Sequence, residues 1–367
     1  MTQIVDWNLA VSTAQRLAPR GPAVQPRQAV EAVRMIRDLA AQAVEPVQAV
    51  TGLSAGPADG AEVVDRPAWI QSNADGMQQA LQPLMELVEG REPPALLREL
   101  GSRGSAIQVG VALAWLSGKV LGQYEAFAPP GQRGRLLLVA PTIVQVERQL
   151  GVPERDFRLW VCLHEETHRL QFGANPWLSD YMRSLIADFL QATELGVAEV
   201  LQRLVSVLAT GARGGRQGSL VEAIQSPAQR AVFDRMTGLM SLLEGHADVV
   251  MDEVGPQVVP SVALIRERFN QRRAQPKALD AAARRLLGMD IKMRQYSDGA
   301  AFVRQVVQQL GMADFNRVWS GPTTLPSREE IKNPQQWIDR MTSLPSHPPT
   351  HCASAPVTGA DAQIAAV

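Results

Sequence analysis

Two histidines and a glutamate in the segment LHEETHRLQF have the residue types and spacing that bind and use a metal ion. Four residues of helix turn through about 400°, so His164 and His168 share one face and lie about 6 Å apart along the axis. Glu165 lies about 100° further round and can reach a water molecule bound to the same ion. This is the H-E-x-x-H arrangement, in which the histidines bind zinc and the glutamate is the general base. The alternative is an ordinary helix whose histidines only cap it or pair with Glu165 and Glu166.

A catalytic zinc ion needs a third protein ligand and an open position. The segment LLEGHADVVMDE is the best source, because His347 and His351 lie in a Pro-rich tail that would hold a rigid site poorly. Glu244 and Asp248 are four residues apart and share a helical face. We predict that Glu244 is the ligand and that Asp248 accepts a hydrogen bond from a ligand histidine. His246 is the second candidate for the ligand, and the alternative for the carboxylates is a solvated, charged helix face.

The remaining pattern predicts a mainly α-helical protein with a small β element next to the motif helix. The motif helix is expected over about 157–172, with Asp156 as its cap. Further helices are expected over 27–50, 67–89, 105–125, 178–209 and 227–253, with shorter ones over 260–319. The segment RLLLVA, residues 135–140, is the clearest strand candidate. It is interpreted as an edge strand that could align an extended peptide.

Composition narrows the class of protein. The charges nearly cancel, with 36 Lys and Arg residues against 37 Asp and Glu residues, which argues against nucleic acid or an anionic membrane as a partner. The most apolar run has about eight unbroken residues, whereas a membrane span needs roughly 20. No secretory signal is apparent. Two cysteines, Cys162 and Cys352, are too few for a disulfide framework, so a reducing, cytoplasmic compartment is expected.

Six segments together carry a resemblance to a known family. H-E-x-x-H, with 75 residues between His168 and a Glu-x-x-x-Asp motif that begins at Glu244, resembles the gluzincin class of metallopeptidases. VVDRPAW, VLGQYEAF, LLLVAPTIVQVERQL, FRLWVCLHEETHRLQFGANPWL, LMSLLEGHADVVMD and RVWSGPTTLPSREEIKNPQQWIDR resemble the zincin-like type 2 family over about residues 60–341. These are actinobacterial proteins described as zinc-dependent metalloproteases or as associated with deazaflavin coenzyme biosynthesis. No deazaflavin-binding motif can be quoted from the chain, so that association is not adopted.

The resemblance implies a mostly helical zincin-like fold, with His164 and His168 as ligands of Zn²⁺, Glu165 as base and the acidic third ligand on Glu244. Glu166 stands where the family more often has an apolar residue. The expected organisation is an N-terminal helical segment over 1–60, a catalytic domain over 61–345 and a disordered tail over 346–367, with a mobile Gly-rich segment at 210–219.

Three functions are compatible with these residues. The first is a zinc-dependent metallopeptidase acting on a peptide or protein substrate, in which Glu165 activates a zinc-bound water. Its transition state needs a donor to the oxyanion, for which Tyr181, Tyr296 and His246 are candidates. The second is a catalytically silent zincin-like scaffold or interaction protein, and the third is a hydrolase of a non-peptide amide. An open cleft at the metal site favours an enzyme, and a sealed one favours the scaffold.

Overall fold

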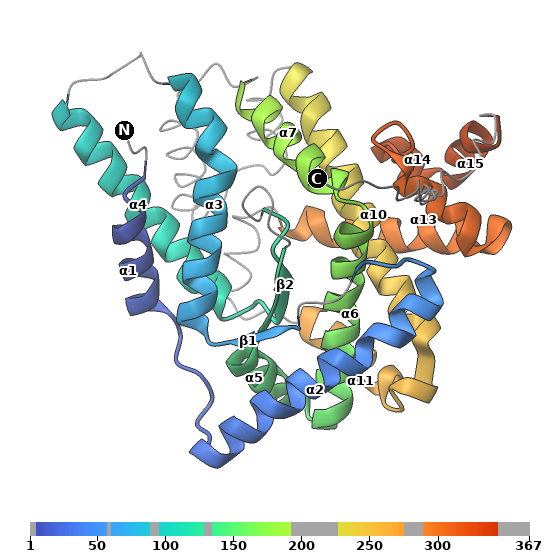
Figure 1. Cartoon of the computed structure of the whole chain (residues 1–367), viewed down its shortest axis with the longest axis horizontal. Coiled ribbons are helices and arrows are strands. Elements are labelled where there is room, and N and C mark those ends of the chain that lie inside the picture. Colours follow the sequence, from blue (N-terminus) through green and yellow to red (C-terminus); the bar gives the residue numbers. More distant parts are fainter. Residues whose placement is uncertain are drawn as a thin grey trace, which may run out of the picture.

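The computed structural model describes residues 5–56, 60–88, 95–127, 134–191, 227–274 and 289–343, and most of them are helical. The helices are α1 (Trp7–Leu17), α2 (Pro26–Thr51), α3 (Arg66–Val88), α4 (Ala95–Ser117), α5 (Ala140–Leu150), α6 (Glu154–Ala174), α7 (Trp177–Gln191), α10 (Pro227–Val258), α11 (Val262–Ala274), α13 (Met289–Phe315), α14 (Arg328–Lys332) and α15 (Pro334–Ser343), with a 3-10 turn at Asn316–Ser320. Helices α1, α3 and α4 lie on one side of a small sheet, and α10, α13, α14 and α15 lie on the other, beyond α6 (Figure 1). The mainly α class with a small β element is confirmed.

The sheet has three strands, β1 (Glu62–Val64), β2 (Gly122–Tyr124) and β3 (Leu136–Val139), in the order β1-β3-β2. The predicted strand at RLLLVA is therefore present as β3, but the prediction that it is an edge strand is wrong. All four of its residues are buried, and it pairs with β1 in parallel and with β2 antiparallel. The edge strands are β1 and β2. Strand β2 lies inside the range predicted as helix over 105–125, because α4 already ends at Ser117.

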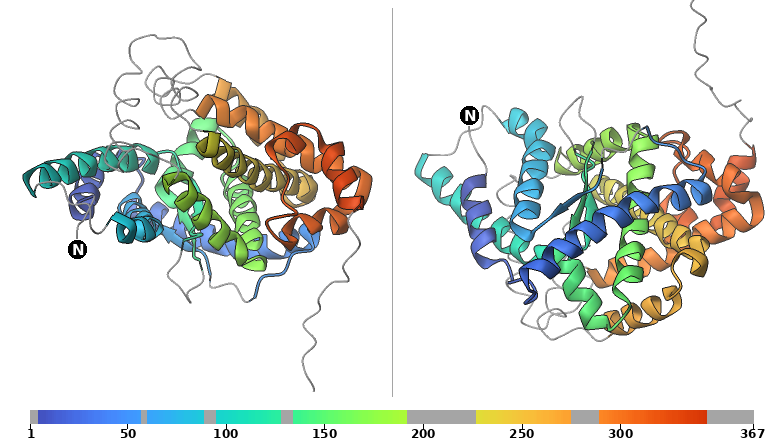
Figure 2. Two further views of the ribbon diagram at one scale, coloured as in Figure 1. Left: turned by 90° about the horizontal axis from the view of Figure 1, so that it is seen from above. Right: turned by 60° about the horizontal axis from the view of Figure 1, so that its bottom comes forward.

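Helix α6 runs through the middle of the molecule, between α2 on one side and α10 on the other (Figure 2). Its apolar residues before the motif, among them Leu159, Val161 and Leu163, share one core with Ile36 and Leu39 of α2. Burial of most of its surface holds the helix rigidly, since interiors pack at the density of organic crystals. The N-terminal helical segment is thus part of the core that supports the motif.

The motif helix begins at Glu154, three residues before the predicted start. Pro153 precedes it, and Glu154 and Asp156 place negative charge in the first turn, where the helix dipole favours it. Asp156 does not cap its own helix, which corrects the prediction. Its Oδ2 instead accepts hydrogen bonds from the backbone N–H and the hydroxyl of Ser261, at 2.9 and 2.7 Å, and so ties α6 to the start of α11.

Helices α10 and α13 cross with their backbones in contact. A Cβ added at Gly245 would lie 2.5 Å from the backbone N of Ala300 and 2.6 Å from the backbone O of Gly299. A Cβ at Gly299 would overlap the backbone of Ser241 in the same way. These two glycines therefore set how closely α10 approaches α13, and Gly245 directly follows the predicted ligand Glu244.

Among the described residues no helix is long and apolar enough to cross a bilayer. The Gly-rich segment 210–219 and the tail over 346–367 lie outside the residues that the structure describes.

Candidate metal centre

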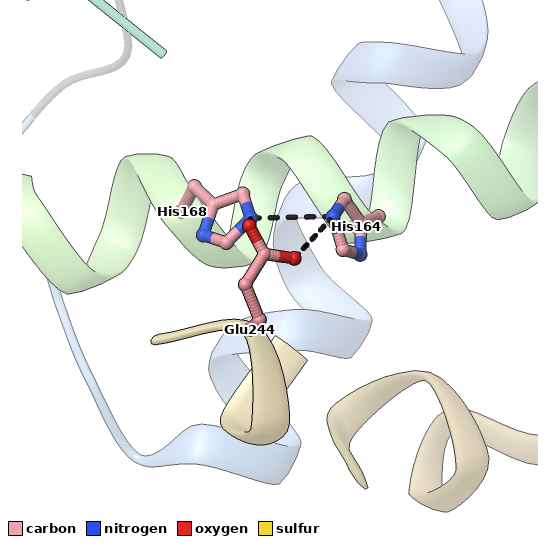
Figure 3. A group of neighbouring side chains, drawn as sticks. All are labelled: His164, His168 and Glu244. Atoms are coloured by element: carbon pink, nitrogen blue, oxygen red, sulfur yellow. Dashed lines mark hydrogen bonds and ion pairs between the residues drawn. The ribbon is translucent and has the colours of Figure 1, made fainter. Parts of the chain in front are cut away.

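Three side chains from two helices converge on one point. His164 and His168 project from the same face of α6, and Glu244 reaches them from α10 (Figure 3). The two Nε2 atoms are 3.2 Å apart, and the carboxylate oxygens of Glu244 lie 3.7 Å from His164 Nε2 and 3.8 Å from His168 Nε2. One ligand atom from each of the three residues can be chosen so that all lie within 4.8 Å of one another.

This donor set fits a zinc-sized cation. Two nitrogens at the usual zinc–nitrogen distance of about 2.0–2.1 Å, in tetrahedral geometry, are about 3.4 Å apart, close to the observed separation of the His164 and His168 nitrogens. Two imidazoles and one carboxylate are the ligand types of a catalytic zinc site with an open position. The side chains of His164 and Glu244 are 28% and 26% exposed, so a cation can reach them from solvent. These three residues could hold a metal ion.

A glutamine that the sequence reasoning missed connects the ligands. Gln171 is fully buried, and its Oε1 lies 2.9 Å from Nδ1 of His168. Its Nε2 lies 2.9 Å from the carbonyl oxygen of Leu243 and 2.9 Å from Nδ1 of His246. Gln171 follows His168 by three residues, and that helical spacing was the available signal.

His246, the second candidate for the third ligand, turns away from the metal centre. It is completely buried, with its ring stacked on Phe315 and edge-on to Trp319. Burial, and to a smaller extent the nearby His168, lowers the pKa of His246 to about 3, so this imidazole is neutral. The structure brings Glu244, and not His246, to the two motif histidines.

Asp248 does not contact the ligand histidines, which corrects the prediction of its role. Its carboxylate lies 2.9 Å from Nη1 of Arg266 and 3.3 Å from Nη2 of Arg304, in a cluster that also includes Asp252. Nδ1 of His164 lies 3.3 Å from the thioether sulfur of Met251. The place expected for Asp248 beside a ligand histidine is taken by Gln171 at His168.

Glu165, the predicted base, lies against the edge strand β2. A Cβ at Gly122 would come within 2.6 Å of Glu165 Cγ, so only glycine leaves room for this side chain beside β2. Burial, and to a smaller extent the charge of Glu244, raises the pKa of Glu165 to about 8. Among the described residues no group donates a hydrogen bond to this carboxylate. The carboxyl therefore holds a proton at neutral pH until a nearby positive charge favours ionisation.

Glu166 and Cys162, which are close to the metal-binding histidines in the sequence, are both buried in the interior. Glu166 accepts two hydrogen bonds from Arg169, at 2.7 and 2.6 Å, and both residues are buried. This salt bridge is buried, not at the surface. Cys162 is a buried core residue whose sulfur lies 3.8 Å from the carbonyl oxygen of Ile36 in α2, and burial raises the pKa of its thiol.

A cleft of about 840 Å³ opens beside the metal ligands. Its lining includes His164, Glu165, His168 and Glu244, with residues of α3, of the segment around β2 and of α7. Much of the remaining lining is apolar and comes from α3, α6, α7 and α10: Met77, Leu81, Phe172, Met182, Ile186, Met240 and Leu243. An open cleft at the ligands is the feature expected of an enzyme.

Two of the three expected oxyanion donors do not line this cleft. Tyr181 packs beside Trp177, with ring centroids 6.0 Å apart, and His246 is buried behind Gln171. The side chain of Tyr296 lies outside the described residues.

Comparisons with known proteins agree with this geometry. Residues 5–338 match a family model described as a zincin-like metallopeptidase. Among solved structures, the chain is similar to a protein from Chloroflexus aurantiacus described as "a putative hydrolase with a novel fold". The two are 33% identical, with a TM-score of 0.67, over 93% of this chain and 99% of the other. No curated protein matches significantly.

Proposed function

Because the chain belongs to the zincin-like metallopeptidase family, we propose that it is a zinc-dependent hydrolase of peptide bonds. The observation that carries the proposal is the convergence of His164, His168 and Glu244 at an open cleft, next to the buried carboxyl of Glu165. The similar Chloroflexus protein supports the coarser class of hydrolase.

In this proposal the chain supplies three ligands and a base. When bound, zinc would polarise the substrate carbonyl and make water more acidic. His164, His168 and Glu244 would hold the ion. Glu165 would accept a proton from the attacking water at its carboxylate and return it to the nitrogen of the leaving amine. The raised pKa of Glu165 suits a group that must both take up and release a proton near neutral pH.

The edge strand β2 supports a peptide as the substrate. The backbone bond from Val139 N to Leu121 O places Leu121 in the ladder with β3. Gly122, the next residue, therefore directs its N–H and C=O away from β3, to the free edge. That edge lies beside Glu165 and lines the cleft. An extended peptide could add there as a further strand, through backbone hydrogen bonds that read no particular sequence.

Metal analysis joined to an unbiased cleavage assay tests the proposal. Purified protein is expected to carry one zinc ion and to cleave members of a broad peptide and protein library. Glu165→Gln keeps the size of the side chain and removes the base, so it should retain zinc and lose hydrolysis. Loss of zinc in Glu165→Gln would make Glu165 a ligand. A wild type that carries full zinc and cleaves no peptide would favour a scaffold or a non-peptide amide as substrate.

A further inference from the structure

The amide of Gln171 has one possible orientation, and this orientation fixes a proton on a metal ligand. The carbonyl oxygen of Leu243 can only accept a hydrogen bond, so the group 2.9 Å from it must be the NH2 of Gln171. The Oε1 of Gln171 then faces Nδ1 of His168 at 2.9 Å. An amide oxygen only accepts, so Nδ1 of His168 must carry the hydrogen. In the neutral ring, Nε2 of His168 is then left with a lone pair directed at His164 and Glu244.

We propose that Gln171 is a positioning residue that holds His168 in the tautomer able to bind the metal ion. The inference rests on the zinc-binding part of the proposed function, but not on peptidase activity. Gln171 takes the role expected of Asp248, since a ligand histidine is usually oriented by an acceptor at its far nitrogen.

The same side chain joins the two helices that supply the ligands. Gln171 belongs to α6, whereas Leu243 and His246 belong to α10 and flank Glu244 in the sequence. Its two hydrogen bonds to Leu243 and His246 therefore hold the turn of α10 that presents Glu244. The amide oxygen of Gln171 fixes the tautomer of His168, and the amide nitrogen holds the turn of α10 that carries Glu244.

His246 completes the arrangement as the second acceptor for the amide nitrogen. Its Nδ1 accepts a hydrogen bond from the NH2 of Gln171, so the hydrogen of this neutral ring is on Nε2. No partner for that Nε2 is found among the described residues, in a site walled by Phe315 and Trp319. The hydrogen bond from Gln171 gives this fully buried histidine a structural role that does not require metal binding.

Zinc affinity, measured by competition with a chelator, is the first test. Gln171→Met is close in size but removes the amide. It should weaken zinc binding by about 10- to 100-fold, the usual effect of losing such a partner. Gln171→Glu keeps an acceptor for His168 but loses the donor to Leu243 and His246, so it should keep the hydrogen of His168 on Nδ1 and recover only part of the affinity. The matched control is Thr167→Val, which removes a buried hydrogen bond to Leu163 on the same helix without contacting a histidine. Its zinc affinity should equal that of wild type.

The tautomer itself is the second test, and it needs neither zinc nor activity. Histidine-selective 15N NMR of the metal-free protein, with His168→Gln to assign the signal, should show the hydrogen of His168 on Nδ1. In Gln171→Met that preference should be lost. A hydrogen on Nε2 of His168 in the metal-free wild type would overturn the proposal. So would unchanged zinc affinity in a folded Gln171→Met variant.

These outcomes separate the inference from the proposed function. If zinc affinity and the tautomer depend on Gln171 while no peptide is cleaved, the inference stands and the peptidase activity fails. If peptides are cleaved but Gln171→Met binds zinc as tightly as wild type, the proposed function stands and the inference about Gln171 fails.

Discussion

Two carboxylates in this protein, one buried and one partly buried, have opposite surroundings, and the contrast points to the site. Glu330 of α14 is surrounded by donors, whereas Glu165 of α6 has none among the described residues. Burial alone would raise the pKa of both. At Glu330 the hydrogen bond from Arg340 and those from Ser327 outweigh burial and lower the pKa. At Glu165 nothing opposes burial, and the nearby Glu244 adds to it.

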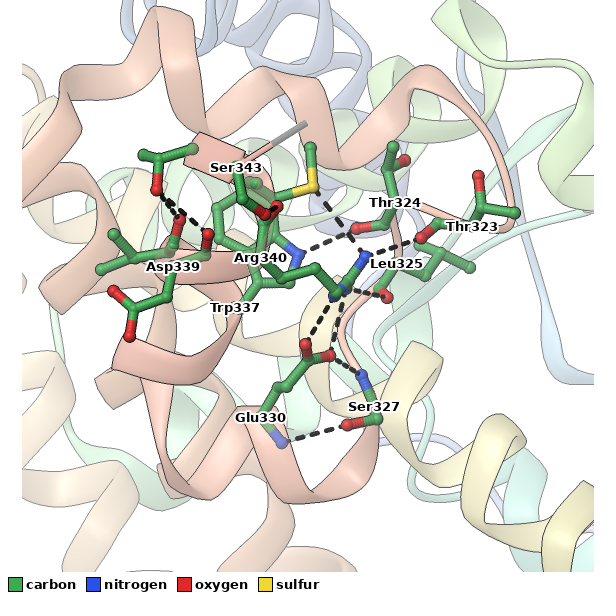
Figure 4. A network of polar contacts seen from close by, with 12 residues as sticks. Thr323, Thr324, Leu325, Ser327, Glu330, Trp337, Asp339, Arg340 and Ser343 are labelled. Atoms are coloured by element: carbon green, nitrogen blue, oxygen red, sulfur yellow. Dashed lines mark hydrogen bonds and ion pairs between the residues drawn. The ribbon is translucent and has the colours of Figure 1, made fainter. Parts of the chain in front are cut away.

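The region around Glu330 is complete without any ligand. Arg340 donates to both oxygens of Glu330, at 2.7 and 3.1 Å, and to the backbone carbonyls of Thr323 and Leu325 (Figure 4). Ser327 and Glu330 exchange two further hydrogen bonds in a capping box that begins α14. Each acceptor there has a donor from the chain, so this network serves to fix α14 and α15.

The metal centre has the opposite balance, with acceptors in excess of donors. Two imidazole nitrogens face one another at 3.2 Å, and a carboxylate faces both. Nδ1 of His168 carries the hydrogen of that ring, so only His164 can place a hydrogen between these groups. That one hydrogen would have to serve both the His168 nitrogen and the Glu244 carboxylate. Buried polar groups in folded proteins usually have partners. The comparison teaches that a cation supplied from outside the chain would satisfy this excess of acceptors, as the network at Glu330 is satisfied from within.

The largest expected effect is the loss of the metal. His164→Ala or Glu244→Ala removes one of the three ligands, and zinc per chain should fall from one to near zero after dialysis. Arg340→Met should leave zinc at one per chain, because the network at Glu330 needs no cation. Mass spectrometry of the metal content measures both. Full zinc in either ligand variant would contradict the assignment of that ligand.

A pH series on the metal-free protein comes next. The pKa of Glu165 is about 8 in the folded protein and about 4.5 in the unfolded chain. Its contribution to stability is therefore present below about pH 4.5 and is lost as pH rises through about 8. Glu165→Gln cannot ionise, so it should gain stability over wild type between pH 6 and 9, on the order of a few kcal/mol. Urea unfolding measures the difference.

Added zinc sharpens the same experiment. A cation beside Glu165 favours the ionised carboxylate, so the gain of Glu165→Gln at high pH should shrink in the zinc-loaded protein. A gain that is equal with and without zinc would mean that the cation does not lie near Glu165.

Arg340→Met should have a smaller effect than the loss of the metal. Its effect on the free energy of unfolding should be the same with and without zinc. The variant leaves Glu330 without its charged donor, and we expect a loss of about 2 kcal/mol in the free energy of unfolding. The matched control is Arg183→Met, which breaks an exposed pair with Asp180 and should change stability by less than about 0.5 kcal/mol. A loss in Arg340→Met that depends on zinc would remove the contrast between the two regions.

The smallest expected effect is at acid pH. The pKa of Glu330 is lower in the folded protein than in the unfolded chain, so its contribution is present above about pH 4.5 and is lost as pH falls below that value. Glu330→Gln should be less stable than wild type at pH 7, and the difference should shrink as pH falls below about 4.5. A difference that stays constant over this range would show that Glu330 is not the group that titrates.

The sequence predicted those parts of the site that depend on spacing within one helix. His164 and His168 share a face because they are four residues apart, and Glu244 follows from the shortage of other ligands. The helices of the mainly α class were predicted from apolar periodicity, and the strand was predicted at 135–140 from a short apolar run. Each of these predictions needs only the geometry of a single element.

Predictions that depend on what lies opposite an element were the ones that failed. Asp248 shares a face with Glu244, but the sequence cannot show that Arg266 and Arg304 meet it there. Gln171 has the right spacing from His168, yet its role appears only once Leu243 is beside it. Likewise, the apolar run of β3 fits a central strand as well as an edge strand, and only the pairing with β1 and β2 decides.

The crossing of α10 and α13 has a consequence for how this protein can change over generations. Gly245 and Gly299 are 54 residues apart in the sequence, from 245 to 299, but both lie against the backbone of the opposite helix. A Cβ at Gly245 would overlap the backbone of Gly299 and Ala300, and a Cβ at Gly299 would overlap the backbone of Ser241. Neither glycine can be replaced without moving the turn that carries Glu244. Related chains that keep this close crossing should therefore have glycine at both positions, and a side chain at either one should be accompanied by a wider separation of α10 and α13.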